Sequence, residues 1–163
     1  MASVLQVSTS PGGVPKHAIP EGFLGPLGIE GDGHDHPKFH GGHTRAILMI
    51  SSEGIEELKA AGFPLFLGAL GENITTEGVD RRLWRSGQRW RIGNAVIELT
   101  KMRVPCDQLN VYGRGIQKAV FDPQVKAGDF TSPRWGLSGF YASVVTPAEI
   151  HAGDPISLLS EVV

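Results

Sequence analysis

The stretch Gln88-Arg89-Trp90-Arg91-Ile92-Gly93-Asn94-Ala95-Val96-Ile97-Glu98-Leu99-Thr100 alternates in polarity on both sides of a turn. Trp90 and Ile92 share one face of the first arm, with charged residues between and beside them, because successive side chains of a strand point to opposite faces. Gly93-Asn94 is a turn sequence, and the second arm resumes the alternation. Its apolar face carries Ala95, Ile97 and Leu99. The pattern predicts a β-hairpin over 88–100.

Other segments on both sides of this hairpin also carry strand patterns. Strands are predicted at 3–9, 45–51, 73–76, 139–145 and 155–159. One helix is predicted over 53–61, capped by Ser51-Ser52 and stopped by Gly62, and a short helical turn at 116–120. Segments 10–25 and 121–134 are predicted to be loops, and 147–153 a turn.

The composition sets the class of protein. The chain has 163 residues, 40% of them apolar and 20% charged, with 22 glycines and 11 prolines scattered along it. These values predict one globular domain over 1–163, mainly β, with tight corners typical of a twisted, mostly antiparallel barrel and a few short peripheral helices. The formal charge of −2 gives no support for a nucleic-acid or membrane partner. A lone cysteine and no signal-peptide pattern predict a cytoplasmic protein.

A first cluster of candidate functional residues lies at 31–43. Four of the six histidines fall within ten positions, at His34, His36, His40 and His43. Neutral imidazoles are common metal ligands, so one hypothesis is a divalent-metal module that uses these four side chains. Their spacing matches no structural zinc pattern, and a polar loop with backbone-bonded histidines is the alternative. The glycines of this stretch allow close approach of the backbone to a ligand.

A second cluster is Gly68-Ala69-Leu70-Gly71-Glu72-Asn73-Ile74-Thr75. Its backbone N–H groups and side-chain amide are donors for an oxyanion, although a simple turn into a strand explains the same residues.

The third candidate is the only cysteine, Cys106, with Arg103 close by in Arg103-Val104-Pro105-Cys106. A nearby cation favours the thiolate, which attacks electrophiles and binds soft metals. A buried structural thiol is the alternative.

Taken in order, five segments resemble the MOSC domain, named after the C-terminal part of molybdenum-cofactor sulfurases. They are Gly31-Asp32-Gly33-His34 leading into His40-Gly41-Gly42, the second cluster, Arg103–Cys106, Gly139-Phe140-Tyr141-Ala142-Ser143-Val144, and Ala152-Gly153-Asp154-Pro155-Ile156. The set spans nearly the whole chain. The subgroup it is most similar to is the free-standing type related to hydroxylaminopurine-resistance proteins, which carry a further helical region after this domain.

The resemblance implies a β-barrel of the kind found in pyruvate kinase, and a site that binds molybdenum cofactor. Cys106 matches the family's cysteine, which would ligate molybdenum in a reductase of N-hydroxylated bases or similar small molecules, or carry sulfur without substrate turnover. The resemblance places Gly41, Gly42, Gly71, Glu72 and Asn73 at the cofactor. Arg45 and Arg103 would meet its phosphate, and His34 and His40 would shuttle protons. An electron-donor protein or a cysteine desulfurase is the implied partner, and pyridoxal phosphate is not expected. Substrate and oligomeric state stay open.

Overall fold

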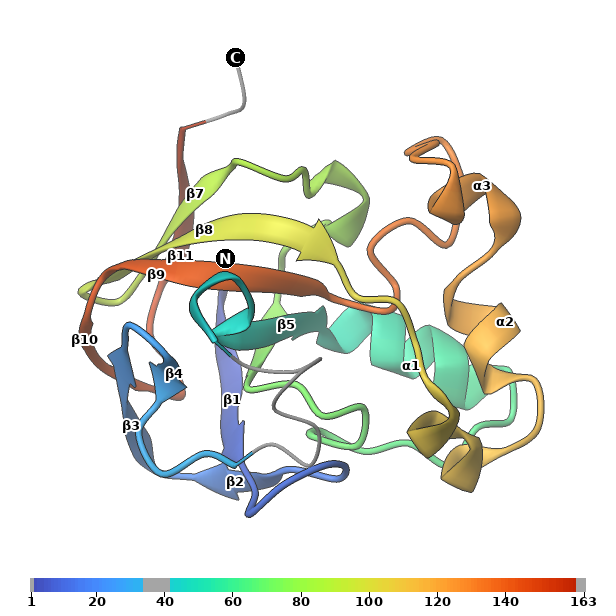
Figure 1. The fold of residues 1–163 in the computed structure, drawn as a ribbon, viewed down its shortest axis with the longest axis horizontal. Helices are drawn as coiled ribbons and strands as arrows, with labels where there is room; N and C mark the ends of the chain where they lie inside the picture. Colours follow the sequence, from blue (N-terminus) through green and yellow to red (C-terminus); the bar gives the residue numbers. More distant parts are fainter. Residues whose placement is uncertain (1, 34–41, 161–163) are drawn as a thin grey trace.

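The computed structural model describes residues 2–33 and 42–160, with the side chain of Ser160 left out. Within these residues the largest unit is an eight-stranded sheet of order β11-β7-β8-β9-β5-β6-β1-β2 (Figure 1). Neighbouring strands run antiparallel except β5 and β6, which are parallel. The strands are β1 (Ser3–Thr9), β2 (His17–Ile19), β5 (Ile47–Ser51), β6 (Ile74–Glu77), β7 (Arg89–Ile92), β8 (Ala95–Met102), β9 (Phe140–Thr146) and β11 (Ile156–Ser160).

A second sheet of three strands lies beside the first, in the order β10 (Ala148–His151), β3 (Glu21–Gly25), β4 (Gly28–Ile29). Here the sequence prediction was wrong, because 10–25 was expected to be loop and 147–153 a turn. β3 and β10 are held by each other, with Ala148 opposite Leu24 and His151 opposite Glu21. Strands this short carry too little alternation to be found locally, so a partner far along the chain decides their conformation.

The predicted class, mainly β with a few short helices, is confirmed. The helices are α1 (Ser52–Ala60), α2 (Ile116–Val120) and α3 (Pro123–Lys126), with 3-10 turns η1 (His43–Arg45), η2 (Arg81–Leu83) and η3 (Asp107–Tyr112). The predicted closed barrel is not confirmed. An isolated bridge joins Ser3 to Pro155, just before β11, and Val4 N donates to Asp154 O at 2.9 Å. No continuous ladder between β1 and β11 is formed among the described residues.

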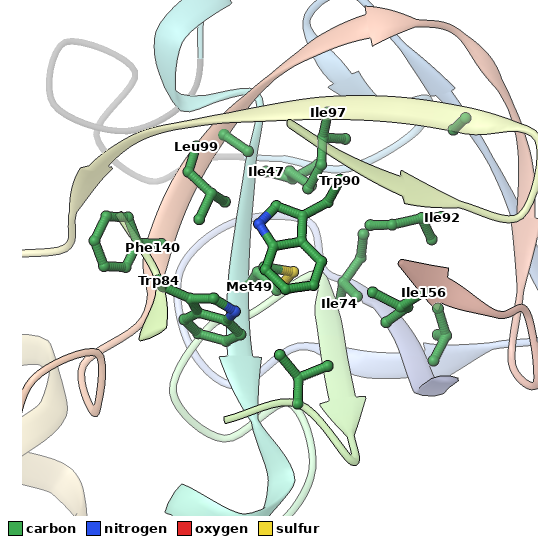
Figure 2. Packing of buried hydrophobic residues seen from close by; sticks show 14 of the residues in the cluster. Ile47, Met49, Ile74, Trp84, Trp90, Ile92, Ile97, Leu99, Phe140 and Ile156 are labelled. Carbon is green, nitrogen blue, oxygen red and sulfur yellow. The ribbon is translucent and has the colours of Figure 1, made fainter. Parts of the chain in front are cut away.

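The hairpin predicted over 88–100 is confirmed as β7 and β8, with Ile92 opposite Ala95 across the turn. Its apolar face is buried in the main hydrophobic core, where Ile92 and Ile97 have no exposed surface. Figure 2 shows how these side chains pack with residues of β5, β6 and β9. Trp84 and Phe140 meet edge to face, with ring centroids 6.2 Å apart. This packing fixes the strands whose ends carry the candidate site.

A second core lies on the other face of β5, under α1. Every residue of β5 is buried, because Ile47 and Met49 enter the first core while Leu48 and Ile50 enter the second. Ile55 and Leu58 of α1, which lie three positions apart, are buried there. The helix begins at Ser52 rather than at 53, and Gly54 N donates to the capping Ser51 Oγ at 3.0 Å. In the part of the chain that the structure describes, no helix has the length and apolar character needed to cross a membrane.

Candidate functional site

Cys106 occupies the junction between the sheet and the second core. β8 ends at Met102, and Cys106 is the residue that precedes η3, with its backbone carbonyl accepting from Leu109 N at 3.2 Å. Its side chain is half-buried, so it is neither a core residue nor a freely exposed one. This exposure does not favour the interpretation of Cys106 as a buried structural thiol. It is compatible with a thiol that a ligand can reach.

Arg103 joins three segments that lie far apart in the sequence. Its backbone N donates to Gly139 O at 2.8 Å, and its guanidinium donates to Leu70 O at 2.8 Å and to Ser138 O at 3.5 Å. Ser138 Oγ in turn donates to Arg103 O at 2.7 Å. The side chain is 3% exposed, and its Nε finds no hydrogen-bond partner among the described residues. Arg103 thus joins the segment after β8 to the 68–75 segment and to the residues that precede β9, with a buried positive charge.

Glu72 is fully buried and shapes the second cluster from inside. Its carboxylate accepts from Gly68 N at 2.9 Å, from Leu70 N at 3.2 Å and from Thr75 Oγ1 at 3.1 Å. Burial raises the pKa of Glu72, and these hydrogen bonds and the Arg103 charge oppose the rise. The side chain therefore orders the loop backbone around Gly71. Its predicted contact with a cofactor stays a prediction.

Asn73 and Asp32 connect the second cluster to the first. Asn73 Nδ2 donates to Asp32 Oδ2 at 2.8 Å, and Asn73 Oδ1 accepts from Leu48 N at 3.1 Å. Lys16 Nζ donates to Asp32 Oδ1 at 2.7 Å, and the side chains of this ion pair are only 7% and 3% exposed. Gly33 follows without room for a side chain, since a Cβ there would lie 1.8 Å from Pro11 O. This network fixes the point from which the histidine-rich stretch departs.

Tyr141 brings Arg45 and Cys106 together. The Arg45 guanidinium lies over the Tyr141 ring, 5.3 Å from its centroid. Burial raises the pKa of Tyr141, the charges of Arg103 and Arg45 oppose the rise, and a charge on Cys106 adds to it. The charges of Arg45, Arg103 and Cys106 therefore all act on the Tyr141 phenol.

A second phenol, that of Tyr112, bonds the 68–75 segment. Tyr112 OH donates to Ala69 O at 2.5 Å. Burial raises the pKa of Tyr112 to about 12, so this phenol stays a donor at neutral pH.

The structure links some of the sequence-predicted residues that it describes. Arg103 donates to Leu70 O in the loop that carries Gly71, Glu72 and Asn73. Arg45 contacts Tyr141, and Cys106 follows Arg103 by three positions. Gly42 precedes η1, whose His43 is exposed. The predictions for His34, His36, His40 and Gly41 fall outside the described residues.

Sequence reasoning missed the supporting side chains Lys16, Tyr112, Ser138 and Tyr141, and it gave Asp32 no role. Tyr141 lies inside the predicted strand 139–145 and in one of the five segments that resemble the family, which is a signal for it. Lys16 carried no signal, because it lies in a stretch predicted to be loop and its partner follows 16 residues later. A buried ion pair of this kind becomes visible only when the fold brings its two members together.

The half-buried thiol of Cys106, after a core strand of a β scaffold, is the centre of the candidate site. The MOSC domain family model matches residues 36–157. The chain belongs to the MOSC domain family.

Among curated proteins, Protein YiiM of Escherichia coli is 33% identical over 145 residues, which cover 86% of this chain and 60% of that protein. The uncharacterized protein YflK of Bacillus subtilis is 29% identical over 135 residues, covering 81% and 56%. The chain thus spans less than two thirds of the length of these relatives.

Solved structures give the same match. The crystal structure of Escherichia coli YiiM has a TM-score of 0.68 at 27% identity, covering 99% of this chain and 71% of that one. The structure of YiiM from Geobacillus stearothermophilus has a TM-score of 0.70 at 21% identity, covering 98% and 76%, and it supports the fold alone.

Proposed function

We propose that this MOSC domain binds the molybdenum cofactor with Cys106 as the protein ligand of the metal, and that it acts in the reduction of N-hydroxylated small molecules. The observation that carries the proposal is the position of Cys106: a half-buried thiol that follows core strand β8 by four residues and whose charge acts on Tyr141. Family membership supports the same conclusion.

The residues present fit this cofactor by their chemistry. A thiolate is a soft ligand that suits a soft metal centre, and the cofactor also carries an anionic phosphate. Arg45 and Arg103 put positive charge at the site, and the Nε of Arg103 is a buried donor without a partner among the described residues. Fork-shaped guanidinium donors are the side chains best suited to phosphate.

Each residue would contribute a distinct part. When bound, the cofactor supplies the two-electron redox chemistry. Arg103 would keep the loop that carries Gly71 in place next to the segment that leads to Cys106. The overall reaction, R–NH–OH + 2 e⁻ + 2 H⁺ → R–NH₂ + H₂O, needs proton donors near the substrate, and His34 and His40 are our candidates for that role. The electrons would come from a separate donor protein, in a cytoplasmic setting.

Metal analysis tests the proposal. The chain produced in a host that makes molybdenum cofactor should contain close to one molybdenum and one pterin per chain. Cys106→Ala should remove most of the molybdenum. The control is Val111→Ala in η3, because Val111 is 75% exposed and its truncation leaves the site intact. Equal molybdenum in the wild type and in the Cys106→Ala variant would refute the role of Cys106.

A second candidate is sulfur carriage, favoured by the same accessibility of the thiol. The Cys106 thiolate would attack the outer sulfur of a cysteine desulfurase persulfide, form a persulfide of its own and release the desulfurase thiolate. Mass spectrometry after incubation with a desulfurase and cysteine should then show one added sulfur on the wild type and none on Cys106→Ala. An unmodified thiol under conditions that load a known acceptor would exclude this function.

A further inference from the structure

The three-stranded sheet carries a group of metal-ligating side chains that the proposed function does not use. Glu149 and His151 are two apart on β10, so they point to the same face, and His151 stands opposite Glu21 of β3. One donor atom from each of Glu21, Glu149 and His151 lies within 4.8 Å of the others, and all three residues are exposed. The group therefore combines two carboxylates and one imidazole on paired strands, where the backbone fixes their spacing.

The imidazole of His151 is in contact with a fourth side chain, the carboxylate of Asp154. His151 Nδ1 lies 2.9 Å from Asp154 Oδ1, and His151 N donates to Asp154 Oδ2 at 2.9 Å. The Asp154 side chain is only 14% exposed. A carboxylate on one ring nitrogen is the usual outer support of a metal-binding histidine, because it fixes the ring and makes the other nitrogen a better donor. Here that other nitrogen is Nε2.

The two carboxylates and the imidazole come from paired strands, so a cation placed between them would meet three donor atoms without any change of the backbone.

We propose that Glu21, Glu149 and His151 form a binding site for a divalent transition-metal ion of the zinc type, with Asp154 as its outer support. Mixed imidazole and carboxylate donors suit Zn²⁺, and three protein ligands leave one position for water. Bond lengths of about 2 Å put tetrahedral ligand atoms roughly 3.3 Å apart. The donor atoms therefore have to close by at most about 1.5 Å, which rotation of exposed glutamate side chains allows. The site ties β3 to β10.

Calorimetry with ZnCl₂ alone tests this proposal, on the untagged, chelator-treated chain. All variants carry Cys106→Ala, so that the thiol adds no zinc. We expect saturable binding that falls by one ion per chain in Glu149→Gln and in His151→Ala, and about tenfold weaker binding or more in Asp154→Asn. Glu30→Gln is the matched control, since Glu30 is an exposed carboxylate next to β4 and outside the cluster.

A thermal melt of each variant shows whether it is folded and gives an independent readout. Zinc should raise the melting temperature of the Cys106→Ala parent and of the Glu30→Gln control, and it should leave the His151→Ala variant unchanged. The proposal is overturned if the parent binds no zinc, or if Glu149→Gln and His151→Ala retain its full stoichiometry. The molybdenum analysis of Cys106 is unaffected by either outcome, so the two proposals fail separately.

Discussion

Removal of Asp32 is the most informative single change in this protein. The Asp32 carboxylate accepts hydrogen bonds from the buried Lys16 ammonium at 2.7 Å, from the Ser10 backbone N at 3.0 Å and from the Asn73 side-chain amide at 2.8 Å. Asp32→Ala leaves a cation, an N–H group and an amide without this acceptor. The change acts on the segment that leads into the histidine-rich stretch, so it links the stability of the fold to the site.

The expected cost follows from the burial of the ion pair. Removing one partner of a buried, hydrogen-bonded pair costs about 3–5 kcal/mol, because the remaining charge stays desolvated. Domains are stable by only about 5–15 kcal/mol, so the variant should lose a large part of its free energy of unfolding. At about 2–4 °C per kcal/mol for a chain of this size, the melting temperature should fall by roughly 10 °C.

Urea unfolding of four proteins measures this effect: the wild type, Asp32→Ala, Lys16→Met and the double variant. The double variant should be less destabilised than the sum of the single ones, since it no longer contains an unpaired buried charge. Glu56→Ala serves as the control, because its ion pair with Lys59 is exposed and should contribute less than about 1 kcal/mol. The reasoning is refuted if Asp32→Ala loses less than about 1 kcal/mol of its free energy of unfolding, or if the losses of the two single variants add up to that of the double variant.

Three further outcomes are expected. Gly139→Ala should lower the free energy of unfolding by about 3 kcal/mol, because Gly139 has φ +97° and a Cβ there would lie 2.6 Å from Ile50 Cγ1. Gly128→Ala is the control: Gly128 has φ +82° with open space around it, so the loss in the same denaturant titration should be about 1 kcal/mol. Tyr112→Phe should lower the free energy of unfolding by about 1–2 kcal/mol through the unpaired Ala69 carbonyl, and a loss indistinguishable from zero would contradict the hydrogen bond. Because burial raises the pKa of Glu72, the folded protein holds this proton more tightly than the unfolded chain, so stability should fall as pH rises from about 4.5 toward the folded pKa. Glu72→Gln should flatten that slope in denaturant midpoints measured from pH 4.5 to 8, and an identical slope in both proteins would count against the buried carboxylate.

Local patterns were sufficient for the elements that carry their own signals. The β7–β8 hairpin alternates on both arms, β5 is a continuous apolar run, and α1 begins with a serine cap, so all three are predictable from short windows. β3 and β10 are not, because segments of four or five residues carry too little pattern of their own and become strands through pairing with distant residues.

The same distinction applies to the site. Cys106 and Arg103 stand three positions apart, so their proximity can be inferred from the sequence. Arg103 also bonds Leu70 O, 33 residues away, and Asp32 bonds Asn73, 41 residues away. Such contacts follow from the arrangement of the sheet and have no counterpart in local spacing.

The pairing of β3 with β10 also sets an order of events during synthesis. β3 leaves the ribosome early, but the strand that pairs with it is made about 120 residues later. At about 5–20 residues per second, β3 waits roughly 6–25 s with an open backbone edge. During this interval the edge is available to other nascent chains, and only completion of the C-terminal segment covers it. Residues 148–151 therefore cover the edge formed by residues 21–24 once they are made.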